Sequence, residues 1–255
     1  MRSRRNEDAS IWAHSFRGSL KGILRASFGI AAENAPSLSP SRNKGQRCAM
    51  IRRNEMRNEY ADLIKEVCEC LHEVAVGFRK IRIESPHRRI GNGEWTKAIL
   101  HRLYECARGD VCGDRFSACP AYEKEWQDGE WLYDMIWYKD DPDFKDGDIA
   151  GLHRSLKEVV LVLESEWSHS NWDIQYDFEK LLVAKSPIKV MIVDDVGSMG
   201  ISIVENGLKR FDTRNYGVDD YEELYLLAQY ENASGDFAFW LGSSSSKILE
   251  QYKLK

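Results

Sequence analysis

The stretch "EVVLVLESEWSHSNWDIQYDFEKLLVAKSPIKVMIV", residues 158–193, decides the fold class. Its first part, about 158–167, is rich in Val and Leu and is typical of a buried strand. A helix is predicted at about 173–185, and the apolar run after Pro187 predicts a second strand at 188–193. Strand, helix and strand in this order indicate an α/β domain.

Five further elements surround this stretch. They are an amphipathic helix within 53–81, a helix at 94–109 capped by its final Gly, a β-hairpin within 121–141, a short helix at 204–211 and a second hairpin at 222–242. The first hairpin turns at "QDGE" and the second at "NASG". From residue 94 the order is helix, three strands, helix, strand. This order predicts a mixed central sheet flanked by helices, with a C-terminal hairpin.

The composition is that of a globular protein, since 43% of the 255 residues are hydrophobic and 30% are charged. No run approaches the roughly 20 apolar residues that a membrane-spanning helix needs, so no membrane partner is expected.

The six cysteines follow no disulfide framework, and reduced thiols in a cytoplasmic protein are expected. A zinc site of His101, Cys106, Cys112 and Cys119 can be drawn, but its spacing lacks the paired knuckles of common zinc folds, which favours ordinary buried thiols.

Charge divides the chain into two parts. Residues 1–50 are rich in Arg and Ser and carry a net charge of +6, which leaves −11 on residues 51–255. The first part is predicted to be a disordered basic leader, a transit peptide, or a stretch ahead of a translation start at Met50 or Met56. The second is predicted to be a single domain. Its acidity argues against nucleic-acid binding through a broad basic surface, so such binding would need a local patch or bound cations.

Two carboxylates interrupt the predicted strand at 158–167. Glu164 and Glu166 are two residues apart, so their side chains point to the same face of the sheet. In the preceding strand, within "EWLYDMIWYKD", Asp134 is the acid that breaks an apolar and aromatic run. If the two strands are neighbours, Asp134 lies beside the two glutamates, and three acids share one edge.

Three buried carboxylates repel one another, and burial beside Val and Leu adds to the cost. A proton or a cation must therefore neutralise them. Mg²⁺ or Mn²⁺ suits this site, because Mg²⁺ is bound through one or two carboxylates while it keeps several waters and substrate phosphate oxygens. In that position the cation would activate water and stabilise a leaving oxyanion.

The acid on the second strand and the acid-x-acid on the third, "ESE", resemble the PD-(D/E)XK nuclease superfamily, to which many restriction endonucleases belong. The resemblance covers about residues 94–193. It implies a restriction endonuclease-like core and a metal-dependent nuclease that hydrolyses phosphodiester bonds, with DNA favoured over RNA as the substrate. Asp134 would stand for the first Asp of the motif, Glu164 for its second acid, and Glu166 where the usual pattern has Lys.

The sequence departs from the family pattern at two positions. Tyr133 stands where Pro precedes the first acid, and Glu166 replaces the Lys. Other members place the Lys on the following helix, which makes Lys180 the candidate for orienting water or balancing phosphate charge. Glu94, which opens the helix before the first hairpin, is the candidate for a fourth metal-binding acid.

Structural interpretations stand beside these functional ones. The glutamates could form the solvated face of a strand, Asp134 could face water, Lys180 could be a surface residue, and Glu94 could be a favourable charge in the first turn of a helix. The alternative function is a catalytically inactive nuclease-fold domain that binds nucleic acid or protein. A homodimer is compatible with the sequence. The loop "DDVGSMG" fits neither a P-loop nor a dinucleotide fingerprint.

Overall fold

A computed structural model describes residues 44–110, 116–120, 132–141, 156–211 and 222–254, and the side chains in these ranges except those of 44–58, 109–110 and 119–120. The helices are α2 (Lys44–Glu84), α3 (Asn92–Glu105), the π-helical turn η1 (Cys106–Asp110), α4 (Asn171–Val183) and α5 (Met199–Arg210). None of the helices in these ranges is long and apolar enough to cross a membrane.

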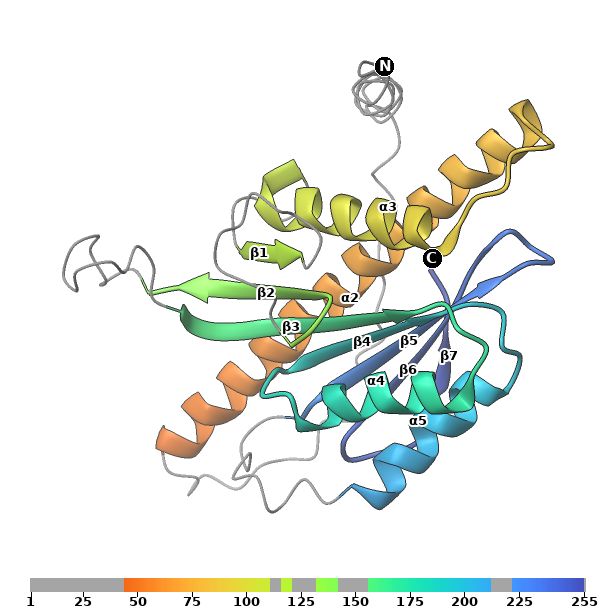
Figure 1. The fold of residues 1–255 in the computed structure, drawn as a ribbon. Helices are drawn as coiled ribbons and strands as arrows, with labels where there is room; N and C mark the ends of the chain where they lie inside the picture. The colour runs from red at the N-terminus through yellow and green to blue at the C-terminus, as the bar shows by residue number, and fades with distance from the viewer. Residues whose placement is uncertain (1–43, 111–115, 121–131, 142–155, 212–221, 255) are drawn as a thin grey trace, which may run out of the picture. The chain divides into compact units, whose positions relative to one another are not determined.

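Seven strands form one mixed sheet in sequence order (Figure 1). They are β1 (Ser117–Pro120), β2 (Met135–Asp140), β3 (Leu156–Glu166), β4 (Ile188–Val193), β5 (Leu224–Glu231), β6 (Asp236–Ser243) and β7 (Glu250–Tyr252). The three central strands β3, β4 and β5 run parallel, whereas β1 and β2 on one side and β6 and β7 on the other pair antiparallel. Helix α4 connects β3 to β4, and α5 follows β4, as expected for parallel neighbours.

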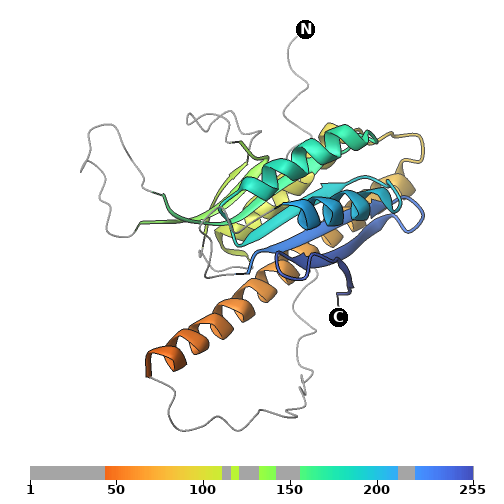
Figure 2. The same ribbon diagram turned by 90° about the horizontal axis from the view of Figure 1, so that it is seen from below.

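Helices cover both faces of this sheet (Figure 2). Helices α2 and α3 share a buried cluster with one face, to which Leu161 and Leu163 of β3 contribute. Helices α4 and α5 share a second cluster with the opposite face, to which Val162 of β3 contributes. Since side chains alternate along a strand, Glu164 and Glu166, which follow Val162 by two and four positions, lie on the face covered by α4 and α5.

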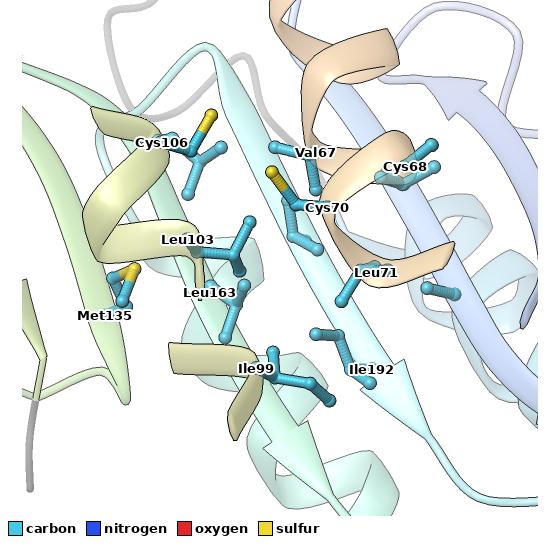
Figure 3. Packing of buried hydrophobic residues seen from close by; sticks show 14 of the residues in the cluster. Val67, Cys68, Cys70, Leu71, Ile99, Leu103, Cys106, Met135, Leu163 and Ile192 are labelled. Atoms are coloured by element: carbon cyan, nitrogen blue, oxygen red, sulfur yellow. The ribbon is translucent and has the colours of Figure 1, made fainter. Parts of the chain in front are cut away.

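The cluster under α2 and α3 contains three buried thiols, those of Cys68, Cys70 and Cys106, none of which forms a disulfide (Figure 3). Burial is the main cause of the raised pKa of Cys68, which keeps that thiol protonated. For these three of the six cysteines, the prediction of ordinary buried thiols is confirmed. Of the other residues drawn into a zinc site, His101 is exposed beside Glu105. The side chains of Cys112 and Cys119 lie outside the described residues, so that site stays untested.

The predicted α/β class, the mixed sheet and the order helix, three strands, helix, strand are confirmed by α3, β1, β2, β3, α4 and β4. The C-terminal hairpin is confirmed by β5 and β6, which pair from Leu224–Ser243 to Glu231–Asp236 around the predicted turn. The first strand predicted for the other hairpin, and its turn, fall within 121–131, outside the described residues. The strand that pairs with β2 is β1, which was not predicted.

Two helix ends differ from the prediction. Gly109 does not cap the second helix, because α3 ends at Glu105 and the chain continues as the π-helical turn η1 through Asp110. Helix α2 begins at Lys44, inside the segment predicted to be a leader. The remainder of that segment, residues 1–43, lies outside the described residues.

The packing of α5 on α4 requires a glycine. A Cβ at Gly207 would lie 2.6 Å from Cε1 of Phe178, whose ring is buried in the core, whereas a Cβ at Gly93 in α3 would meet nothing within 4 Å. We expect Gly207→Ala to lower the free energy of unfolding by about 1–3 kcal/mol through overpacking. Gly93→Ala should raise it by about 0.5–1 kcal/mol, because alanine is the better helix former. Urea unfolding of both variants measures this, and equal effects of the same sign would contradict the packing.

Candidate active site

Glu164 is a buried carboxylate near the end of β3. It lies two positions after Val162, and its side chain is 2% exposed on the face covered by α4. Met191 of β4 pairs with it in the sheet, so the carboxyl group sits among apolar neighbours. A carboxylate in this place needs a charged partner or a proton.

Helix α4 supplies a charged partner. The ammonium nitrogen of Lys180 lies 2.8 Å from Oε1 of Glu164 and 2.9 Å from Oδ1 of Asp177, one turn earlier on the same helix. The helix is placed here by its apolar face, on which Ile174 and Phe178 are buried against the sheet. The structure therefore brings together Lys180 and Glu164, the two candidates that the sequence separates by sixteen positions.

Asp134 joins these residues from the neighbouring strand. It directly precedes Met135, which pairs with Leu163, so the antiparallel register continues toward Glu164. Its Oδ2 accepts hydrogen bonds from the backbone N–H and the hydroxyl of Ser165, both at 2.8 Å. These bonds hold the carboxylate beside the carboxyl end of β3.

Glu166 lies one step further along the same face. Its Oε1 accepts a hydrogen bond of 2.5 Å from the backbone N–H of Ser168. Burial is the largest cause of its raised pKa, and Asp177 and Asp173 of α4 raise that pKa further. Asp177 of α4 is thus close both to Glu166 of the sheet and to Lys180 of its own helix. We call Asp134, Glu164, Glu166, Asp177 and Lys180 the carboxylate–lysine cluster.

The cluster holds more acids than its single lysine neutralises. Burial, the largest cause, raises the pKa of Glu164 to about 8, although the Lys180 ammonium acts in the opposite direction. Burial also raises the pKa of Asp134 and that of Glu166. The pKa of Lys180 is raised by its contacts with Glu164 and Asp177, which outweigh its own burial, so this side chain stays charged. The site therefore favours additional positive charge, as a proton or as a cation.

Glu94 takes no part in the contacts of this cluster that the structure describes. Its Oε1 accepts a bond of 2.8 Å from Arg88, and its Oε2 accepts one of 3.1 Å from the backbone N–H of Gly91 at the start of α3. These bonds lower its pKa, the Gly91 bond being the larger cause. The geometry is that of a helix capping box, so the structural interpretation of Glu94 accounts for every contact found.

The donor set fits a hard divalent cation, since Asp134 and Glu164 offer carboxylate oxygens in a site with excess negative charge. In the described part of the chain, however, no three His, Cys, Asp or Glu side chains surround a common point that could hold a metal ion. The Lys180 ammonium takes the place beside Glu164 instead. Binding of a metal would require this ammonium to move away from the carboxylate.

Three contributors to the site were missed by sequence reasoning. Ser165 fixes Asp134, Asp177 shares the Lys180 ammonium, and Tyr133 lies close enough to Glu164 for that carboxylate to raise its pKa, after burial. Asp177 could have been found, because it precedes Lys180 by three residues and therefore lies on the same side of a helix. The role of Ser165 depends on the register between β2 and β3, which the sequence does not carry.

The class defined by fold and site is an α/β domain with a three-layer arrangement and a carboxylate–lysine cluster near the carboxyl end of the central strand β3. Comparison of the sequence with protein-family models gave no match, and comparison with curated proteins gave none either. Among solved structures, NucC from E. coli MS115-1 in its cAAA-bound form matches with a TM-score of 0.34 and 13% sequence identity, over 72% of this chain and 84% of that chain. A likeness of this size carries no argument about function.

Proposed function

We propose that the protein is a nuclease that depends on Mg²⁺ or Mn²⁺ and hydrolyses phosphodiester bonds in DNA. The observation that carries the proposal is the contact of 2.8 Å between Lys180 and Glu164. Glu166 stands where the motif usually has Lys. The contact supports the idea that α4 provides the cationic group instead, through Lys180. Asp134 beside them completes the set of residue types that the resemblance implies.

Each residue has a distinct role in this proposal. Asp134 and Glu164 would hold the metal, which activates water and stabilises the leaving oxyanion. Lys180 would turn from Glu164 to a phosphate oxygen of the substrate, since an ammonium is a mobile point charge on a flexible stem. Glu166, at the outer end of the site and half-buried, would orient the attacking water through its carboxylate.

A second candidate function is favoured by the ion pair itself. Lys180 already balances Glu164 and Asp177 without a metal, as in a site whose acids have become structural. In that case the protein would be an inactive nuclease-fold domain that binds nucleic acid or another protein. The two candidates differ in one property, which is the need for a divalent cation.

Cleavage assays with plasmid and single-stranded DNA test the proposal. We expect cleavage with Mg²⁺ or Mn²⁺ and none with EDTA. Asp134→Asn and Lys180→Met should each lower the rate by roughly 10²-fold or more, because each removes a charge that acts in the transition state. Lys209→Met is the matched control, since Lys209 forms an exposed pair with Glu205 at 3.0 Å on α5, and it should cleave like the unmodified protein.

Metal binding gives a second readout that does not depend on turnover. Isothermal titration should detect Mn²⁺ binding to the unmodified protein and a loss of that binding in Asp134→Asn. Metal binding without cleavage of any DNA tested would favour the inactive candidate. Cleavage that persists at full rate in Asp134→Asn and Lys180→Met would place the activity in a contaminant or another site.

A further inference from the structure

Two aromatic side chains stand exposed on the outer side of α4. Trp172 is 72% exposed and Tyr176 is 59% exposed, and among the described residues they are the only aromatic members of the large exposed apolar side chains. By contrast, Trp167, which precedes the helix, is buried and stacks on Trp95 at 5.4 Å between ring centroids. Single exposed apolar residues need no explanation, but neighbouring exposed aromatic rings often mark a contact surface.

These rings lead directly to the carboxylate–lysine cluster. Positions 172, 176 and 180 are four residues apart, so Trp172, Tyr176 and Lys180 follow one flank of the helix. The Lys180 ammonium lies 5.9 Å from the centre of the Tyr176 ring and 2.8 Å from Glu164. We call these three residues the aromatic flank; it runs from solvent to the buried acid.

We propose that the aromatic flank binds single-stranded nucleic acid, with unpaired bases stacked on Trp172 and Tyr176 and the adjoining phosphate beside Lys180. This inference rests on the proposed function and names its substrate class. Aromatic rings accept any base, because every base has a flat π-face, and such stacking needs no hydrogen-bond readout. Bases inside a duplex cannot use the rings, because both of their faces are covered by neighbouring bases.

Spacing supports an unstacked strand. Four residues of helix advance about 6 Å, whereas stacked bases of one strand are about 3.4 Å apart. Neighbouring bases could therefore occupy both rings only after the strand has been stretched.

The charge of α4 also favours an approach by the bases of a strand rather than by its phosphates. Asp173 and Asp177 directly follow the two aromatic residues, and Glu179 directly precedes Lys180, so α4 carries three acids that repel phosphates. The one cation of the helix is Lys180. A strand can approach such a surface with its bases but not with its backbone, except at Lys180. A duplex carries its phosphates on the outside, so the acids of α4 would repel it.

The test measures binding separately from cleavage. In a Glu164→Gln background, which is expected not to cut, fluorescence anisotropy would report the affinity for a labelled oligo-dT and for a duplex of the same length. We expect oligo-dT to bind at least tenfold more tightly than the duplex. Trp172→Ala and Tyr176→Ala should each weaken oligo-dT binding roughly tenfold, while Trp172→Phe and Tyr176→Phe should keep most of it.

Ile83→Ala is the matched control, because Ile83 is 79% exposed near the end of α2 and should have no effect. Circular dichroism would confirm that the variants stay folded, as expected for exposed positions. Unchanged oligo-dT binding in both alanine variants, or equal binding of duplex and single strand, would overturn the inference. If the two alanine variants lost self-association in sedimentation but kept DNA binding, the inference would likewise be overturned, and the flank would be a protein contact. Failure of the nuclease assay leaves this binding result intact, so the two proposals can fail separately.

Discussion

Glu164→Gln is expected to abolish cleavage and, at the same time, to stabilise the folded protein at alkaline pH. Gln has nearly the same shape, so the packing against Met191 should survive. It carries no charge, so it binds a divalent cation much more weakly than a carboxylate does and avoids the cost of an ionised carboxylate in this buried place. The same substitution therefore removes activity and a source of instability.

The pH dependence of this effect has a definite sign. Burial raises the pKa of Glu164 to about 8 in the folded protein, against an ordinary value of 4.5. The folded state therefore holds a proton that the unfolded state releases, and the stability from this group is full below about pH 4.5 and lost as the pH rises through about 8. Relative to Glu164→Gln, the unmodified protein should lose on the order of 4 kcal/mol between pH 4.5 and 9.

Urea unfolding of both proteins at several pH values measures the difference. Glu158→Gln is the matched control on the same strand, because Glu158 is exposed and forms only a surface pair with Lys139 at 3.6 Å. That control should show little change of the difference with pH. A parallel pH profile for Glu164→Gln and the unmodified protein would mean that Glu164 is ionised throughout, held charged by Lys180.

Lys189→Met is expected to give the largest loss of stability, about 3–5 kcal/mol, because it leaves a buried carboxylate without its counter-charge. Lys189 is fully buried in β4, and its ammonium lies 2.8 Å from Oε2 of Glu223 and 3.1 Å from the hydroxyl of Tyr225. That hydroxyl donates to the same Oε2 at 2.6 Å. Burial lowers the pKa of Lys189, and Glu223 opposes this effect.

A double variant separates the loss of the pair from the loss of packing. Lys189→Met with Glu223→Leu removes both charges, and it should recover most of the stability that the single change loses. Lys209→Met on exposed α5 should cost less than about 1 kcal/mol. The measurement is urea unfolding at pH 7, and a double variant no more stable than Lys189→Met would show that shape, not charge, makes Lys189 important.

Much of the central fold could be predicted from local patterns. The run of Val and Leu before Glu164 and the strand after Pro187 are long and apolar, and the buried face of α4 repeats at helical spacing, so each is specified within its own segment. Strand β1 could not be predicted, because "SACP" has no alternation and becomes a strand only through its pairing with β2. Strand β7 has three residues and depends on β6 in the same way.

The candidate site shows the same division. The expected pairing of their strands predicts that Asp134 and Glu164 lie together, and the following helix offers Lys180. The structure brings these three residues close. Their catalytic roles stay predictions. Glu94 was grouped with them only by analogy of element order. Its carboxylate instead accepts hydrogen bonds from Arg88 and Gly91, which are close in sequence, as part of a helix cap.

The two edges of the sheet have a consequence for how copies of the protein could assemble. The described outer strands are its shortest, β1 with four residues and β7 with three, and β1 ends in Pro120, which has no N–H to donate. Short edges and proline both disfavour the addition of another strand. A homodimer, if it forms, is therefore expected to use helical surfaces rather than a continuous intermolecular sheet. If those surfaces include the exposed side of α4, a second copy and a substrate strand would compete for it.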